Sequence, residues 1–168
     1  MAETVTLKGN TVTLVGPTLN VGDKAPVATV VASDLSEKEI GGAKDKVQLI
    51  ITVPSLDTPV CETETKKFNE LVSGLDVDVT VVSMDLPFAE KRFCESFNIS
   101  NVTVASDFRY RDMEKFGVLI GEGALKGLLA RAVFIVDKEG KIGYKQLVPE
   151  ITQEPNYDDV LENLKKCL

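Results

Sequence analysis

Two apolar runs separated by a helix-like segment limit the folds open to this chain more than any other feature. The runs are VQLIITV at residues 47–53 and VDVTVVSM at residues 77–84, and the pattern between them predicts a helix over residues 60–73. An unbroken apolar run is typical of a strand that is covered on both faces. Strand, helix and strand within about 35 residues form a βαβ unit, with parallel strands and a right-handed crossover.

The rest of the chain adds strands and helices around this unit. TVTLKGNTVTLV consists of two alternating runs about Gly9-Asn10, and it predicts an N-terminal β-hairpin within residues 1–16. Further strands are expected at 27–32 and 101–106, an antiparallel pair at 131–137 and 141–148, and helices at 86–97, 109–117 and 156–166. The fold class is therefore α/β, a central mixed β-sheet flanked by helices, in a single domain over residues 1–168.

Composition excludes several functional classes. Apolar residues make up 43% and charged residues 27% of 168, as in ordinary globular proteins. The net charge of −7 argues against a nucleic-acid surface, which needs clustered Lys and Arg. No apolar stretch approaches the roughly 18 residues of a membrane span. The start, MAETVTLKGN, lacks the basic and apolar regions of a signal peptide, so we expect a cytoplasmic protein.

The chain has no histidine and only three cysteines, Cys61, Cys94 and Cys167. Three cysteines are too few for a disulfide scaffold. The lack of histidine removes Ser-His and Cys-His nucleophile pairs together with histidine metal sites. The cysteine spacing also matches no zinc site, so we expect no metal and no bound cofactor.

Cys61 ends the stretch PSLDTPVC, where the first long strand passes into a helix. With Thr58 as N-cap, Pro59 takes the first helical position and Cys61 the third. Unpaired N–H groups and the positive end of the helix dipole favour a thiolate there. Helical spacing places Cys61, Phe68 and Val72 on one face, so the sulfur should point toward the protein body.

A second interpretation of these residues stays open. Free cysteines are among the most buried residues, and Cys61 could simply be a small core hydrophobe. The acidic residues Asp57, Glu62 and Glu64 oppose a thiolate, so a reactive Cys61 needs a further cation. Arg131 is the candidate because it opens the strand RAVFIVD after a glycine-rich loop. Arg131 could equally be a solvated charge at a strand end.

Cys94 lies in the helix expected at 86–97, which Asp85 can cap. The apolar stripe of that helix is expected to consist of Leu86, Ala89, Phe93 and Phe97. Cys94 lies at the edge of this stripe and, by itself, indicates a half-buried packing residue. Cys167 is the penultimate residue and is assigned no role.

PSLDTPVC fits the Pro-x-x-x-Thr-x-x-Cys pattern of peroxiredoxins, with Pro54, Thr58 and Cys61 at the fixed positions. Together with DLPFAEKRFC and GALKGLLARAVFIVD, in this order, it resembles the bacterial thiol peroxidase subfamily, the atypical 2-Cys peroxiredoxins. The N-terminal hairpin and the ending QLVPEITQEPNYDDVLENLKK also match, so the resemblance covers nearly the whole chain.

The resemblance implies a thioredoxin-like fold and a role for each matching residue. Cys61 would be the peroxidatic and Cys94 the resolving cysteine, and the two would form an intramolecular disulfide. Thr58 would hydrogen-bond thiolate and peroxide, and Arg131 would supply the cation. Pro54 would shape and shield the pocket. Substrates would be hydrogen peroxide and organic hydroperoxides, the reductant would be thioredoxin, and the protein would be a homodimer.

Two other classes of protein share features of this sequence but differ from it at defining positions. A thioredoxin-type disulfide oxidoreductase normally carries Cys-x-x-Cys at the helix start, and Glu64 occupies the second cysteine position. A flavodoxin-like nucleotide binder would need a phosphate-binding glycine loop, and GEGALKG offers only G-x-G. That loop instead suggests a pocket wall.

A disulfide needs Cα atoms within about 7 Å. We therefore expect Cys61 and Cys94 to lie apart until local unwinding joins them.

Overall fold

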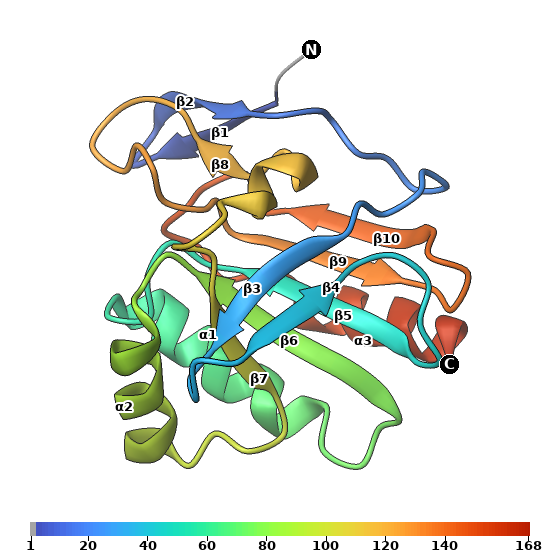
Figure 1. Ribbon diagram of the computed structural model, residues 1–168. Helices are drawn as coiled ribbons and strands as arrows, with labels where there is room; N and C mark the ends of the chain where they lie inside the picture. Colours follow the sequence, from blue (N-terminus) through green and yellow to red (C-terminus); the bar gives the residue numbers. More distant parts are fainter. Residues whose placement is uncertain (1–2) are drawn as a thin grey trace.

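The part of the chain that the structure describes forms two β-sheets and three α-helices (Figure 1). The structure is a computed structural model that describes residues 3–168. Its strands are β1 (Thr4–Leu7), β2 (Asn10–Val15), β3 (Ala28–Ala32), β4 (Glu37–Ile40), β5 (Val47–Thr52), β6 (Val77–Ser83), β7 (Thr103–Ser106), β8 (Leu119–Ile120), β9 (Ala132–Val136) and β10 (Ile142–Leu147). Its helices are α1 (Pro59–Leu71), α2 (Pro87–Phe97), the 3₁₀ helix η1 (Asp112–Phe116) and α3 (Tyr157–Cys167).

The large sheet has the order β10-β9-β5-β6-β7-β3-β4 and is mixed. β5 and β6 pair in parallel from Val47 opposite Val77 to Thr52 opposite Val82, and α1 crosses between them. This confirms the βαβ unit. β9 and β10 form the expected antiparallel pair at one edge of the sheet. The mixed, helix-flanked α/β architecture predicted from the sequence is therefore confirmed.

Two apolar cores lie on opposite faces of the large sheet. Successive side chains of a strand point to opposite faces. Leu49 and Ile51 accordingly pack in the core beneath the helices, whereas Ile50 packs in the core that the hairpin covers. All six residues of β5 are buried, as its unbroken apolar run predicted.

The N-terminal hairpin is present, but its turn differs from the prediction. Asn10 belongs to β2 and pairs with Leu7, so the two turn residues are Lys8 and Gly9. Both have positive φ, 50° and 83°, as a type I′ hairpin turn requires. β8 pairs with β2, and the resulting three-stranded sheet covers one face of the molecule (Figure 1).

The start and the buried face of α2 differ from the prediction. Leu86 is the N-cap, and the carboxylate of Asp85 points away to other partners. The predicted stripe is wrong at Leu86 and Ala89, which are exposed. The buried residues of the helix are Pro87, Glu90 and Phe93. An apolar pattern missed this face because one of its central side chains is a glutamate.

Two further segments differ from the sequence-based expectation. The helix expected over 109–117 is only the short η1, since Arg111 and Gly117 at its two ends adopt left-handed backbone conformations. The polar strand β4 was not predicted.

The final helix is α3, and Asn156 caps it by accepting the Asp159 N–H. Within residues 3–168, no helix is long and apolar enough to cross a membrane.

Candidate active site

Cys61 lies in the first turn of α1, as the sequence predicted. Thr58 is the N-cap and Pro59 the first helical residue. The hydrogen-bond ladder of the helix begins at the Glu62 N–H, which donates to the Thr58 carbonyl at 3.0 Å. The N–H groups of Val60 and Cys61 precede that ladder and face the end of the helix where the dipole is positive. Cys61, Phe68 and Val72 are all buried on the predicted face.

Arg131 brings a positive charge directly to the Cys61 sulfur. Its side chain is only 2% exposed, and its Nη1 donates to Cys61 Sγ at 3.2 Å. Nε and Nη2 both donate to the carbonyl of Ile151, at 3.0 and 2.8 Å. A guanidinium presents its donors in a rigid planar fork, so these bonds fix its orientation. The structure therefore brings together the sulfur and the cation that the sequence suggested, from segments 70 residues apart.

Glu64 is a member of the site whose partner the sequence did not reveal. Its carboxylate accepts a hydrogen bond from Arg131 Nη1 at 2.7 Å, and both side chains are buried. Burial raises the pKa of Glu64 to about 7, although the Arg131 charge acts in the opposite direction. The spacing of three residues from Cys61 places both on one helix face, and this signal could have identified the pair.

A pocket of about 390 Å³ opens beside Arg131 and the start of α1. Pro54 and Thr58 from the PSLDTPVC stretch line one side of it. Pro54 is buried, while Thr58 is exposed and donates its hydroxyl hydrogen to the Ser55 carbonyl at 2.9 Å. The lone pairs of the Thr58 hydroxyl therefore stay available to a ligand in the pocket.

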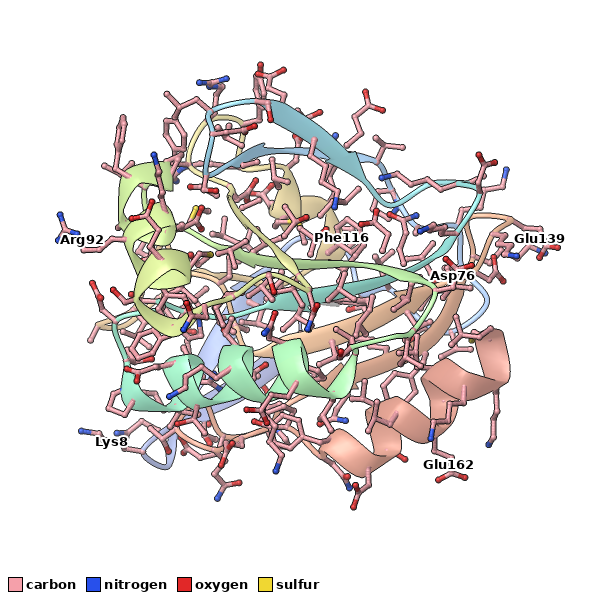
Figure 2. All side chains as sticks on the ribbon, turned by 90° about the horizontal axis from the view of Figure 1, so that it is seen from below. Lys8, Asp76, Arg92, Phe116, Glu139 and Glu162 are labelled. Atoms are coloured by element: carbon pink, nitrogen blue, oxygen red, sulfur yellow. The ribbon has the colours of Figure 1, made fainter. Side chains whose placement is uncertain are left out.

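The other walls of the pocket come from distant parts of the chain. Leu125 belongs to the GEGALKG segment, which the sequence suggested as a wall, and Leu128 follows directly after it. Leu7 and Lys8 come from the N-terminal hairpin, whose role as a wall the sequence did not reveal. Figure 2 shows Lys8 at the hairpin tip, on the side of the molecule where α1 begins.

The hairpin tip is held by one carboxylate from the far end of the chain. Glu150 accepts the backbone N–H groups of Lys8 and Gly9 at 3.1 and 2.9 Å, and the Thr6 hydroxyl at 2.9 Å. It also accepts the N–H and hydroxyl of Thr152. These hydrogen bonds lower the pKa of Glu150 to about 2. The carboxylate therefore keeps its charge, and its hold on the hairpin, across the neutral range.

Comparison with known proteins identifies the family. The Redoxin family profile matches residues 20–161. The chain is 78% identical to a protein named thiol peroxidase from Aquifex aeolicus over the full length of both. It is 56% identical to another of that name from Campylobacter jejuni, covering 90% of this chain and 87% of that protein. The chain belongs to the thiol peroxidases of the Redoxin family.

Solved structures agree with this family at the level of the fold. A peroxiredoxin-like protein from Aquifex aeolicus matches with a TM-score of 0.98 and 78% identity, covering 100% of this chain and 99% of that one. A thiol peroxidase from Chromobacterium violaceum has a TM-score of 0.85 at 19% identity, covering 97% and 95%. The chain is thus an enzyme of the thiol peroxidase type on a thioredoxin-like fold.

The second cysteine of this thiol peroxidase, Cys94, lies in a different environment. Its side chain is half-buried in α2 and lines a groove formed with β7 and the turn between β3 and β4. Burial, with smaller contributions from Glu90 and Glu95, raises the pKa of the Cys94 thiol to about 11. Cys61, Cys94 and Cys167 are all free thiols, so the structure represents the reduced enzyme. Within residues 3–168, no cluster of three metal-ligating side chains occurs.

Proposed function

We propose that this thiol peroxidase reduces hydrogen peroxide and organic hydroperoxides through a cycle in which Cys61 is the peroxidatic cysteine. The observation that carries the proposal is the contact of 3.2 Å between Arg131 Nη1 and Cys61 Sγ, beside a pocket that reaches the same arginine. A cationic donor stabilises a thiolate, which is the nucleophilic form of cysteine. The apolar side chains of Leu7, Leu125 and Leu128 suit the organic part of a hydroperoxide.

The first step is attack by the Cys61 thiolate on the terminal oxygen of the hydroperoxide. A sulfur–oxygen bond forms, the O–O bond breaks, and the leaving oxygen takes a proton to become water or an alcohol. Cys61 is oxidised to sulfenic acid. Negative charge moves from sulfur to the leaving oxygen, so donors directed at that oxygen lower the barrier. We assign this role to Arg131, Thr58 and the first-turn N–H groups, and we assign to Pro54 the shielding of the sulfur from bulk water.

The second step is condensation of the sulfenic acid with Cys94. The Cys94 sulfur attacks Cys61, a Cys61–Cys94 disulfide forms, and water leaves with the sulfenic hydroxyl and the thiol proton. A dithiol reductant of the thioredoxin type then returns both cysteines to thiols by exchange and is itself oxidised to a disulfide. A reducing compartment such as the cytoplasm fits this cycle.

The enzyme is proposed to act as a homodimer. Four exposed apolar side chains lie in or directly after the loops that follow the neighbouring strands β6 and β7. Leu86, Phe108 and Tyr110 belong to these loops, and Phe88 lies in the first turn of α2. These loops are adjacent, since the Asp107 N–H donates to the Ser83 carbonyl at 2.9 Å. Exposed apolar patches of this kind commonly mark protein interfaces.

Peptide mapping by mass spectrometry tests the cycle. Fully reduced protein receives one equivalent of peroxide and is quenched with an alkylating agent. A Cys61–Cys94 link that forms while Cys167 stays alkylated is the expected result. A sulfenic acid that persists on Cys61 would remove Cys94 from the cycle. Three unreacted thiols would return Cys61 to a purely structural role.

A further inference from the structure

Asp85 lies between β6 and α2, and its carboxylate is bonded to the segment that carries Cys61. Oδ1 accepts the hydroxyl of Ser55 at 2.8 Å, and Oδ2 accepts the N–H of Leu56 at 2.8 Å. Ser55 and Leu56 belong to the PSLDTPVC stretch that leads into α1. Asp85 therefore stabilises residues 55–56, which lead into the helical turn that carries Cys61. Asp85 itself lies just before the helix that carries Cys94.

The same carboxylate is linked to α2 through Ser83, the last residue of β6. Ser83 Oγ lies 2.7 Å from Asp85 Oδ2 and 3.0 Å from Glu90 Oε2, and Ser83 and Glu90 are fully buried. Burial and the Asp85 charge raise the pKa of Glu90 to about 9, so Glu90 is a carboxylic acid at neutral pH. Glu90 then donates its proton to Ser83, and Ser83 donates its own to Asp85. We call Ser55, Leu56, Ser83, Asp85 and Glu90 the Asp85 network.

Away from this network, the start of α1 and the body of α2 are separated. A cleft of about 260 Å³ lies between Asp57 and Glu62 on one side and Arg92 and Ser96 on the other. At the far end, Asn69 of α1 accepts the N–H groups of Ser100 and Asn101 at 3.1 and 2.7 Å. Polar contacts thus fasten α2 near both of its ends, with a cleft between them.

Disulfide formation requires both cysteine segments to leave this arrangement. A disulfide joins Cα atoms within about 7 Å, with specific dihedral geometry. Cys61 lies in an ordered first turn and is fully buried, whereas Cys94 lines a separate groove. The intact α2 also keeps Cys94 protonated, because burial raises the pKa of its thiol. Unwinding α2 would expose this thiol to water and allow the attacking thiolate to form.

We propose that Asp85 is a positioning residue whose network holds the Cys61 turn and the Cys94 helix closed together, so that its release opens both segments and sets the rate of disulfide formation. The Asp85 carboxylate bonds directly to Ser55 and Leu56, and it reaches Glu90 of α2 through Ser83, so loss of its bonds weakens both segments at once. The part of this inference that concerns disulfide formation rests on the proposed Cys61–Cys94 cycle.

Hydrogen exchange of the reduced protein tests the structural part. In Asp85→Asn an amide NH₂ group replaces one carboxylate oxygen. The neighbouring groups are hydrogen-bond donors and the NH₂ group cannot accept from them, so bonds within the Asp85 network are lost. Amides of residues 55–62 and 86–97 should exchange about tenfold faster than in the wild type. Asp137→Asn is the control, since the Asp137 carboxylate also accepts hydrogen bonds, from two backbone N–H groups in the turn after β9, away from the Asp85 network. Unchanged exchange in either segment of Asp85→Asn would overturn the coupling.

Rapid-quench mass spectrometry after one equivalent of peroxide tests the kinetic part. Asp85→Asn should form the Cys61–Cys94 disulfide about tenfold faster than wild type, with the initial peroxide step changed less than twofold. Ser55→Ala, which removes one bond without adding a donor, should give about a threefold increase and serves if Asp85→Asn does not fold. Equal or slower disulfide formation in the variants would overturn the role of Asp85. If the wild type forms no such disulfide, the proposed cycle fails, whereas hydrogen exchange still decides whether the network couples the segments.

Discussion

At the scale of single residues, the site depends on how the donors of Arg131 are divided. Two of its nitrogens bond to the Ile151 carbonyl, and the third is shared between Cys61 and Glu64. The backbone bonds hold the guanidinium in place, and the shared nitrogen contacts the reacting sulfur. Lysine, a point charge on a flexible stem, cannot reproduce both functions.

The variant Arg131→Met should slow peroxide reduction by about 100-fold or more. Loss of thiolate alone accounts for less, since a free cysteine is already roughly 3% thiolate at neutral pH and full ionisation gains only about 30-fold. The remainder reflects the donor lost from the leaving oxygen. Stopped-flow rates, compared with the thiolate fraction from ultraviolet absorbance, separate the two effects. The double variant Arg131→Met/Glu64→Gln controls for the buried carboxylate left unpaired. Rates that simply follow the thiolate fraction would contradict the donor role.

Glu90→Gln should change how stability depends on pH. The pKa of Glu90 is about 9 in the folded protein, against 4.5 for an ordinary glutamate. Its protonated form therefore stabilises the fold fully below about pH 4.5, and this contribution is lost as pH rises toward 9. Glutamine keeps a donor to Ser83 without titrating. The free energy of unfolding of Glu90→Gln should thus rise relative to wild type by about 1 kcal/mol per pH unit between roughly pH 5 and pH 8. Denaturant titrations across that range measure the difference, and parallel curves would show that Glu90 does not titrate in this way.

Sequence reasoning located some members of the site and missed others for a physical reason. Cys61, Thr58 and Pro59 were placed correctly because helix starts follow local rules of capping and spacing. Arg131 was suggested as the cation by its place after a glycine-rich loop, but a solvated charge stayed open as an alternative, since no local rule joins residues so far apart. The partners of Glu64 and the burial of Glu90 depend on tertiary packing, which a single sequence does not encode as a visible pattern.

At the scale of elements, the predictable segments are those with one strong pattern. β5 and β6 were expected because their apolar runs suit the interior of a sheet. β4 has the sequence EKEI and lies at the edge of the large sheet, so no apolar pattern marks it. The helix expected at 109–117 is replaced by the shorter η1. Arg111 and Gly117, which flank η1, have left-handed backbone conformations, so the helix does not extend beyond them.

Oxidation should loosen two elements selectively. In the proposed Cys61–Cys94 disulfide form, residues 58–62 and 87–97 should lose hydrogen-exchange protection, because we expect the link to require local unwinding of both helical segments. The central strands β5 and β6 should keep their protection, since their residues lie within the sheet and its cores. Exchange of reduced and oxidised wild-type protein, followed by mass spectrometry, provides the measurement. Equal protection of the helical segments in both states would contradict local unwinding.

At the scale of the whole molecule, the exposed patch of Leu86, Phe88, Phe108 and Tyr110 carries a prediction about assembly. Phe88 is 67% exposed in the isolated chain. Phe88→Asp should shift the proposed dimer toward monomer, because the substitution would place a charge in the proposed apolar interface. Sedimentation velocity at several concentrations measures the shift. Val21→Asp is the control, since Val21 is 63% exposed and lies outside this patch. Identical sedimentation of the Phe88→Asp variant and wild type would exclude the patch as the dimer interface.

The segment Glu150–Thr152 has a consequence for how this enzyme can evolve. Its glutamate holds the hairpin tip that forms one wall of the pocket, and its Ile151 carbonyl holds the arginine that contacts Cys61. Substrate range and reaction rate therefore both depend on residues 150–152. Mutations that move the hairpin to admit a different hydroperoxide will tend to disturb the arginine as well. Selection acting on one trait will change the other, and new substrate preferences should arise more readily through the Leu125–Leu128 wall, which lies outside this segment.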